Sequence, residues 1–198
     1  MWKDFVLGDG SKAVKQVDID GKTVFKKQSY VDTEFTSSLA PTSWTEVTKG
    51  TEYTASNDWG EWRITADSYG GGNDYYVKYA FNNSASTSWE PASASDTDYS
   101  WISIILPQGT SISPKQFSIT ASYLANKSNK AEFQGYIDGT WETLAKLQGV
   151  NLNNYLINVS TDKFYAQFRL YTTSFGSFYR VHIYDFKITS GTIRKAVS

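Results

Sequence analysis

Three segments rich in Ser, Gly and Asn combine aromatic rings with amides, hydroxyls and charged groups: residues 68–76, 123–130 and 172–178. A ring on a loop can stack against the apolar face of a sugar while neighbouring polar groups bond its hydroxyls. The candidate ligand-binding residues are Tyr69, Asn73, Asp74, Tyr75, Tyr123, Asn126, Lys127, Thr173 and Phe175. The alternative interpretation is that these rings pack against the protein's own core and that the lysines are solvated loop charges.

The residue types give little support to catalysis. There is no Cys, and the single His182 lies in an expected strand, where a packed or edge position is the usual role. Paired-His zinc sites are therefore excluded. A glycosidase could act through two carboxylates, and Glu90, Asp96 and Asp98 are close in sequence, but nothing in the pattern indicates that one of them is desolvated. We expect a protein that is not an enzyme and that requires no cofactor.

Charge and hydropathy argue against two further classes of partner. The chain of 198 residues has 19 basic and 20 acidic side chains, for a formal net charge of −1. Nucleic-acid binding depends on clustered Lys and Arg, and the sequence contains no such stripe. Residues 1–5 begin no apolar run of the length that a signal peptide or a membrane span needs. The sequence predicts neither nucleic-acid binding nor membrane insertion.

Short apolar segments separated by polar turns predict an all-β fold. Strands are expected at residues 62–66, 101–106, 116–120, 132–137, 164–171 and 179–189. No segment shows helical periodicity over three turns, and Asp138-Gly139 is expected to form a tight turn. Strands at this spacing without intervening helices are typical of an antiparallel sandwich or barrel.

The first 28 residues differ from the rest of the chain. Val17, Ile19 and residues 24–25 flank Asp20-Gly21, a dipeptide suited to a hairpin turn because both positions tolerate positive φ. We therefore expect residues 1–28 to form an N-terminal β-hairpin extension and residues 29–198 to form the main domain. The alternative is that the hairpin is one more pair of strands in that domain.

Four segments resemble motifs of the discoidin-like family, also called coagulation-factor C-type or galactose-binding-like domains, and occur in the family's order. Residues 80–90 are similar to its early Ala-Phe-Asp-Gly-Asn and Thr-x-Trp-Glu motifs, and residues 100–106 to its Trp-Ile-x-Ile-x-Leu strand. Residues 133–141 are similar to its Phe-x-Ile-x-Gly-Ser-x-Asp-Gly motif, and residues 179–188 to its final strand. The resemblance covers about two thirds of the chain.

This resemblance implies an all-β jelly-roll sandwich whose loops at one end bind sugars, lipids or proteins. It implies that the three candidate loops cluster at that end. The family often places a sugar-contacting Arg near residues 127–130, where this chain has Lys127 and Lys130, so strict galactose specificity is in doubt because an ammonium lacks the bidentate fork of Arg. Trp89, Trp101 and Trp141 fall at strand-like or family-core positions and are expected to be buried.

The resemblance also implies a structural calcium ion, since many family members hold one near the early acidic motif. Asn82, Thr87 and Asp185 occupy the matching positions. Calcium prefers several oxygen ligands including carboxylates, and this set offers one carboxylate. An ion-free turn held by Asn hydrogen bonds is the alternative.

Residues 17–25 are similar to attachment segments in phage tail and baseplate proteins. This resemblance implies a virion or extracellular adhesion module that binds cell-surface saccharide, with tail or baseplate proteins and further copies of the chain as partners. Two alternatives remain open. The chain could be a structural interaction protein without a glycan ligand, or an accessory module of a polysaccharide-degrading system.

Overall fold

The computed structural model describes residues 16–19, 22–26, 28–71, 73, 75–82, 84, 86–92, 99–125, 130–147, 149–173 and 181–197. Of these, residues 16–19, 22–26, 123–125, 130, 149–150 and 173 are described by their backbone alone. The chain divides into two compact units, residues 1–31 with 196–198 and residues 32–195.

The N-terminal unit contains an antiparallel pair of strands. Strand β1 (Gln16–Ile19) pairs with β2 (Lys22–Lys26), with Val17 opposite Phe25. The two strands lie on either side of the predicted Asp20-Gly21 turn, which itself falls outside the described residues. The assignment of residues 1–28 as a separate attachment segment stays a prediction.

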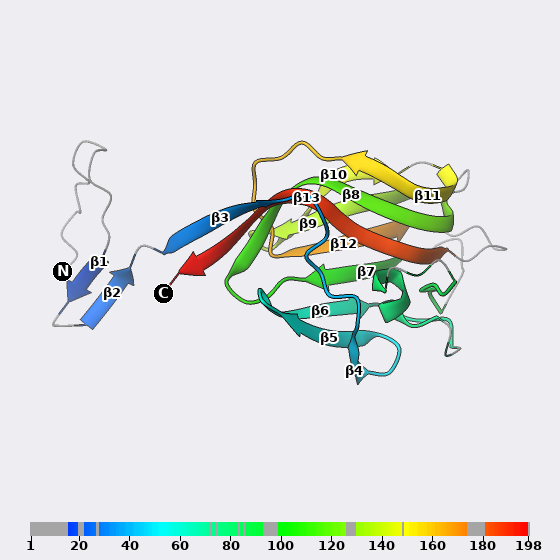
Figure 1. Cartoon of the computed structure of the whole chain (residues 1–198), viewed down its shortest axis with the longest axis horizontal. Coiled ribbons are helices and arrows are strands. Elements are labelled where there is room, and N and C mark those ends of the chain that lie inside the picture. The colour runs from blue at the N-terminus through cyan, green and yellow to red at the C-terminus, as the bar shows by residue number, and fades with distance from the viewer. Residues whose placement is uncertain are drawn as a thin grey trace. The chain divides into compact units, whose positions relative to one another are not determined.

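The second unit is a sandwich of two antiparallel sheets (Figure 1). The seven-stranded sheet has the order β10-β9-β12-β7-β6-β5-β4. Its strands are β4 (Thr45–Thr48), β5 (Glu52–Asn57), β6 (Gly60–Ala66), β7 (Tyr99–Ile105), β9 (Lys130–Ile137), β10 (Thr140–Leu147) and β12 (Gln167–Thr173).

The four-stranded sheet has the order β11-β8-β13-β3. Its strands are β3 (Ser29–Phe35), β8 (Thr110–Ala125), β11 (Gly149–Asn158) and β13 (His182–Val197). One 3₁₀ helix, η1 (Val77–Phe81), is the only helix in the described part of the chain. The predicted all-β jelly-roll β-sandwich is confirmed.

Aromatic side chains from both sheets fill the space between them. Phe133 of β9 lies 4.1 Å, centroid to centroid, from Phe117 of β8, and 5.5 Å from Phe168 of β12. It also meets Phe186 of β13 edge-on at 5.8 Å, and all four rings are at most 1% exposed. Burial of large rings supplies much of the hydrophobic stabilisation of such a core.

The tight turn between β9 and β10 forms as predicted. Asp138 and Gly139 have φ of 49° and 80°, the left-handed values that a two-residue hairpin turn of this kind requires. Thr140 Oγ1 donates to Ile137 O across the turn at 3.1 Å. This turn sets the register in which Trp141 lies opposite Tyr136.

The strand predictions need correction in two respects. The strand expected at residues 164–171 begins only at Gln167, because Tyr165 leaves the sheet, makes an isolated bridge to Ile112 and packs in the core. Strands β3, β4, β5 and β11 were not predicted. They are largely polar, and most of their residues are exposed or only partly buried, so none carries the hydrophobic pattern by which a strand is identified in a sequence.

The expectation that three tryptophans are buried is right for one of them. Trp89 is 0% exposed. Trp101 and Trp141 are only partly buried. Ser100 and Ile102 face the interior, and strand alternation then turns Trp101 to the opposite face of the sheet. Trp141 pairs with the exposed Tyr136 and shares that outer face.

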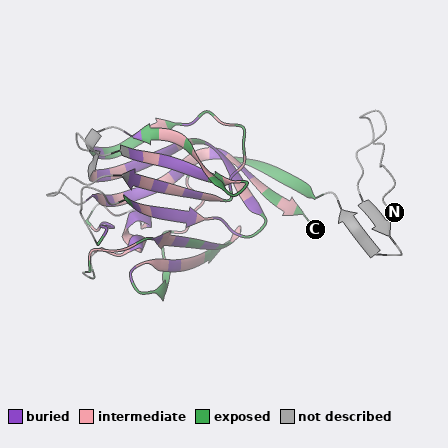
Figure 2. Cartoon of the chain, turned by 180° about the vertical axis from the view of Figure 1, so that it is seen from behind, coloured by how far each residue is buried: buried purple, intermediate pink, exposed green. Residues whose placement is uncertain are grey.

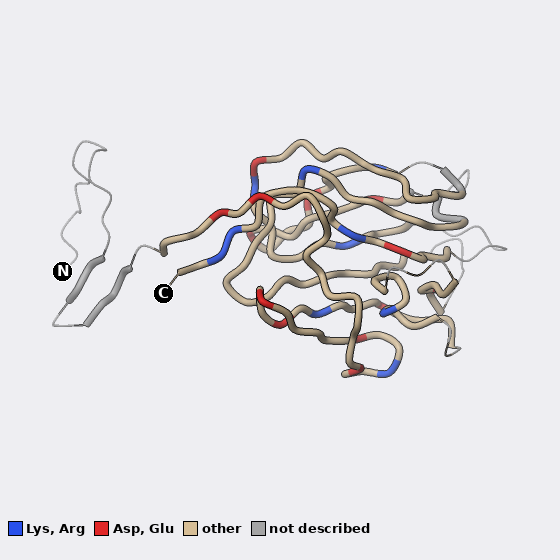
Figure 3. The backbone as a smooth tube through the Cα atoms, viewed as in Figure 1, with Lys and Arg blue, Asp and Glu red and all other residues tan. Residues whose placement is uncertain are grey.

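Acidic and basic residues are interspersed over the described part of the chain (Figure 3). Among the described residues, no helix is long and apolar enough to cross a membrane.

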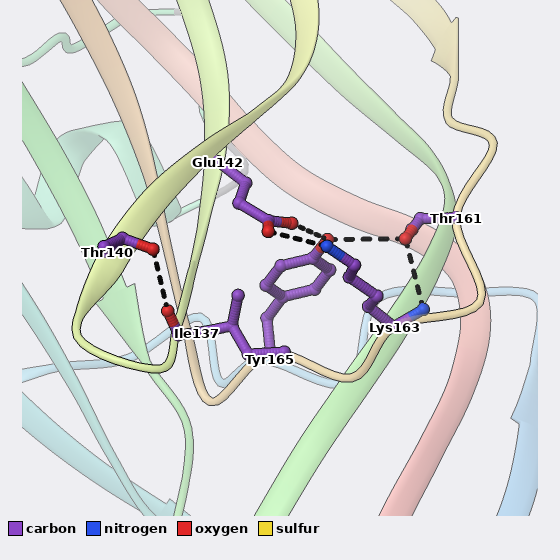
Figure 4. A network of polar contacts seen from close by, with 6 residues as sticks. All are labelled: Ile137, Thr140, Glu142, Thr161, Lys163 and Tyr165. Atoms are coloured by element: carbon purple, nitrogen blue, oxygen red, sulfur yellow. Dashed lines mark hydrogen bonds and ion pairs between the residues drawn. The ribbon is translucent and has the colours of Figure 1, made fainter.

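A polar network fastens the segment before β12 to strand β10 (Figure 4). Lys163 Nζ lies 2.6 Å from Glu142 Oε1, and Tyr165 OH donates to Glu142 Oε2 at 3.0 Å. The Lys163 hydrogen bond, followed by the Tyr165 bond, lowers the pKa of the Glu142 carboxyl, and the same Lys163–Glu142 bond raises the pKa of Lys163. Burial is the main cause that raises the pKa of Tyr165. The network closes over the buried Tyr165 ring.

Candidate functional site

The strand register brings the stems of the candidate loops to one end of the sandwich. Thr173, the last residue of β12, pairs with Lys130, the first residue of β9. His182, the first residue of β13, pairs with Ser122 of β8. The segments that begin after β6, β8 and β12 therefore all leave from this end, which we call the loop end.

Trp89 anchors the segment before β7 at the loop end. Its backbone makes two hydrogen bonds with Ile183, and its indole Nε1 donates to Ser68 O at 2.8 Å. The ring is fully buried, so the backbone around it is held in one position. This anchor places Ser88 and Glu90, on either side of Trp89, beside the start of β13.

Ser88, Glu90 and His182 form a polar cluster there. His182 Nδ1 lies 3.2 Å from Ser88 Oγ, within hydrogen-bond range, and 3.8 Å from Glu90 Oε2. The Glu90 residue is 5% exposed, whereas the His182 side chain keeps 25% exposure. A carboxylate this buried needs polar neighbours, and His182 is one of them.

Aromatic rings border the cluster. The Tyr75 ring meets the His182 ring edge-on, with centroids 6.1 Å apart, and His182 stacks on Tyr184 at 6.2 Å. Gly70 lies against the same groups, since a Cβ at this position would be 3.4 Å from Glu90 Cδ and 3.5 Å from the Tyr75 ring. We call Gly70, Tyr75, Ser88, Glu90 and His182 the rim cluster. It combines a partly exposed ring with a carboxylate, an imidazole and a hydroxyl.

Tyr69 and Asn73, which were predicted to act with Tyr75, contact a different group. Tyr69 packs edge-on against Tyr76 at 5.3 Å and lies directly over Gly50, where a Cβ would be 2.6 Å from the ring. Asn73 Oδ1 accepts a hydrogen bond from Tyr76 OH at 2.7 Å. Tyr76 in turn stacks on Tyr79. The predicted first loop is thus divided between the rim cluster and a tyrosine group beside η1.

The other predicted ligand residues are located only in part. Tyr123 and Thr173 lie at the loop end, in β8 and β12, and are described by their backbone alone. Asp74, Asn126, Lys127 and Phe175 lie outside the described residues. The loop stems converge as expected, and the ligand-binding role of all nine residues stays a prediction.

Asp67 stands at the same end, after β6. Its Oδ1 accepts a hydrogen bond from Trp101 N at 3.2 Å. Loss of hydration raises the pKa of the Asp67 carboxyl and outweighs the backbone hydrogen bonds that lower it, although the residue keeps an exposed edge. This acid was not among the predicted site residues.

The residues of the predicted calcium site bond to one another and to a lysine. Asn82 Nδ2 donates to Thr87 Oγ1 at 3.2 Å, and Ser84 N donates to Asn82 Oδ1 at 3.1 Å. Asp185 Oδ2 lies 2.8 Å from Lys187 Nζ, which neutralises its charge. Over the described ranges, no group of three or more acidic or histidine residues could hold a metal ion. These residues fit calcium poorly, and the ion stays a prediction.

Sequence reasoning assigned no ligand role to His182 or Glu90. His182 was expected inside a strand, and it is instead the first residue of β13, at the loop end. Glu90 was considered only as a catalytic acid. The sequence signal that could have identified Glu90 as a site residue was the Trp89-Glu90 pair, because a buried Trp fixes the orientation of the acid next to it.

No family model matches the chain, and no curated protein matches it. Solved structures do. A point mutant of chitosan-binding module 1 from a chitosanase/glucanase of Paenibacillus sp. IK-5 matches with a TM-score of 0.51 and 19% identity, over 65% of this chain and 92% of that one. The family 32 carbohydrate-binding module of C. perfringens NanJ, in complex with galactose, gives 0.46 and 15%, over 66% and 93%. A pectin-binding module gives 0.49 and 16%, over 63% and 87%. At these identities the likeness concerns the fold.

Proposed function

We propose that this chain is a non-catalytic carbohydrate-binding module that holds a saccharide against the rim cluster at its loop end. The observation that carries the proposal is the position of the Tyr75 ring beside His182, with the buried Glu90 carboxylate 3.8 Å from the imidazole. A sugar ring placed there could stack its apolar face on Tyr75 while Glu90 and Ser88 bond its hydroxyls.

The fold supports this assignment. The sandwich fixes the loop stems through strand pairing, so polar groups at the loop end are held by a rigid scaffold. The chitosan-binding module that shares the fold is, by its name, a polysaccharide-binding protein. Fold similarity alone does not give a ligand, and therefore the proposal depends on the rim cluster.

Binding of isolated saccharides to the full-length chain tests the proposal. A glycan array selects the ligand, and isothermal titration measures its affinity for the wild type and for Tyr75→Ala and His182→Ala. We expect each substitution to weaken binding about tenfold or more, equivalent to roughly 1.4 kcal/mol. Tyr155→Ala is the matched control, because Tyr155 is an exposed tyrosine, at 50% exposure, on β11 and outside the rim cluster.

Two results would overturn the proposal. One is the absence of binding to any saccharide on the array, even by an oligomerised form of the chain. The other is unchanged affinity in Tyr75→Ala and His182→Ala while thermal unfolding stays as in the wild type. A variant that loses both affinity and folding is replaced by Glu90→Gln, which keeps the side-chain volume and removes the charge.

We propose that the chain serves as an adhesion module of a phage tail or baseplate and recognises host-surface saccharide. Residues 1–28 would attach the module to tail or baseplate proteins on the virion. Repetition of weak sites around a symmetric particle would raise avidity by roughly 10²–10⁴ without new contacts. Co-purification with a tail protein that depends on residues 1–28 supports this setting. A genomic neighbour that degrades polysaccharide would favour an accessory module instead.

A further inference from the structure

The outer face of the seven-stranded sheet carries a continuous row of aromatic rings and one guanidinium. Phe168 and Leu170 of β12 are buried in the core, so alternation turns Arg169 and Tyr171 to the opposite face. Tyr171 pairs directly with Trp101 of β7. Figure 2, seen from the side opposite to Figure 1, shows buried stretches alternating with partly exposed ones along these strands.

The members of the row contact one another in sequence across the sheet. Successive distances are 5.0 Å from Tyr136 to Trp141, 4.1 Å from the Trp141 ring to Arg169 Cζ, 4.6 Å from Arg169 Cζ to the Tyr171 ring and 5.9 Å from Tyr171 to Tyr99. We call these five residues the aromatic row. It crosses four neighbouring strands, from β10 to β7.

The rings of the row are accessible although they belong to a packed sheet. Tyr99 is 61% exposed and Tyr136 is 37% exposed, while Trp141 and Tyr171 are partly buried. Exposed aromatic rings in a contiguous patch are typical of interaction sites rather than of ordinary surface. A row of successive contacts across four strands suits an extended ligand better than a compact one.

Arg169 supplies the charge that specifies the ligand. Its Nε donates to Gln134 Oε1 at 2.7 Å, and stacking between Trp141 and Tyr171 holds its plane. Among the residues that the structure describes, no carboxylate forms an ion pair with Arg169. Loss of hydration lowers the pKa of its guanidinium, as expected for a cation removed from water.

Glu132, an acid whose charge acts on Arg169, is already engaged. The Glu132 carboxylate accepts hydrogen bonds from Gln134 Nε2 and Thr143 Oγ1, both at 2.7 Å. Lys146 pairs with Glu132 in the sheet and is exposed on the same face. The row and its neighbours therefore hold two cations against one acid, in a chain whose formal net charge is −1.

We propose that the aromatic row is a second binding surface, separate from the rim cluster, that takes an acidic polysaccharide made of uronic acid units. The sugar rings would lie on Tyr99, Tyr136 and Trp141, and a carboxylate would bond the Nη groups of Arg169 as a bidentate pair. Because the ligand is charged, its affinity falls as salt rises.

Affinity electrophoresis and titration with de-esterified polygalacturonate test this surface, with the fully methyl-esterified polymer as the uncharged probe. We expect the wild type to bind the charged polymer and to bind the esterified one at least tenfold more weakly. Arg169→Gln should reduce affinity about 10- to 100-fold, as for loss of a hydrogen bond to a charged group, and Arg169→Lys should recover only part of it. Tyr99→Ala should lower the affinity for polygalacturonate severalfold.

The controls separate this surface from the rim cluster and from folding. Arg63→Gln removes an arginine of the same sheet that pairs with Glu52, and should leave binding unchanged. For an oligogalacturonate too short to reach the loop end, Tyr75→Ala and His182→Ala should also leave binding unchanged. Tyr99 is exposed at the start of β7, so Tyr99→Ala reports on binding even if Arg169 variants unfold.

Three results would overturn the proposal: equal affinity for the charged and esterified polymers, wild-type affinity in both Arg169→Gln and Tyr99→Ala, or loss of binding in the rim variants alone. Sedimentation of the wild type and Tyr99→Ala completes the test. Self-association of the wild type that Tyr99→Ala abolishes would show that a second copy of this chain occupies the face.

Discussion

The ring of Tyr165 lies directly over the backbone of Gly135, where a Cβ would be 2.5 Å from Tyr165 Cδ1. Tyr165 is 1% exposed, so the ring cannot move away without disturbing the core. Gly135→Ala should therefore lower the free energy of unfolding by about 1–3 kcal/mol, the usual cost of overpacking. Chemical denaturation measures this change.

Gly70→Ala is the control for that substitution. A Cβ at Gly70 would meet its neighbours at 3.4–3.5 Å, which is ordinary van der Waals contact, so stability should change little. Equal stabilities of Gly135→Ala and the wild type would contradict the packing of Tyr165 over Gly135.

The Glu142–Lys163 pair predicts a specific loss of stability in acid. The pKa of Glu142 is lowered in the folded chain. The ionised carboxylate therefore contributes to the free energy of unfolding at pH values above its ordinary pKa near 4.5, and this contribution is lost as the pH falls through the lower pKa of the folded chain. Because the pKa of Lys163 is raised, its ammonium stays charged from acidic to neutral pH and its contribution to stability does not change over this range. Glu142→Gln should therefore have a lower melting temperature than the wild type near neutral pH, and the two melting temperatures should converge once the pH has fallen through the lowered, folded pKa of Glu142.

Melting temperatures of both proteins across this pH range provide the measurement. Glu61→Gln, which changes an exposed acid of β6, serves as the control and should follow the wild-type profile. A constant difference between Glu142→Gln and the wild type at every pH would show that the pair contributes nothing that depends on ionisation.

Ser118 is a buried hydroxyl whose Oγ has no hydrogen-bond partner among the described residues. Removing an unsatisfied polar atom carries little penalty, so Ser118→Ala should leave stability unchanged or raise it by up to about 1 kcal/mol. The matched variant on the same strand is Ser113→Ala. Ser113 Oγ donates to Thr161 O at 3.1 Å, and its loss should lower stability by about 1 kcal/mol. Urea denaturation of the two variants measures both changes. A marked loss of stability in Ser118→Ala would refute the prediction that its hydroxyl contributes nothing to stability.

Calcium should not stabilise the chain measurably. Asp185 is paired with Lys187, and Asn82 and Thr87 bond each other, so these three residues do not present a ready set of oxygen ligands for the ion. Melting temperatures in EDTA and in millimolar calcium should agree, and Asp185→Asn should be destabilised equally in both. A melting temperature that rises with calcium would restore the site inferred from family resemblance.

Local sequence patterns correctly predicted turns and strands whose formation depends mainly on residues adjacent in sequence. The Asp138-Gly139 turn has the predicted positive φ values, and residues 100–106 and 133–141 form strands where motif and alternation placed them. Residues that are distant in sequence were harder to connect. Ser88 and His182 are 94 positions apart, and the bridge from Trp89 to Ile183 brings them together.

The outer face of the sheet was missed for a different reason. Trp101 stands in an apolar run in which inward and outward positions carry similar residues, so the sequence does not show which face it takes. The neighbours that decide this, Tyr171 and Arg169, belong to a strand more than sixty residues away. Sheet register, which depends on long-range pairing, determines the face.

Strand β12 joins the two surfaces. It carries Tyr171 in the aromatic row and ends two residues later at Thr173, where the loop end begins. A polymer long enough to follow this strand would bind the aromatic row and the loop end at the same time. Retention would then grow with polymer length far more steeply than the affinity of either surface alone predicts, and short oligosaccharides would underestimate how firmly the chain holds a long polymer.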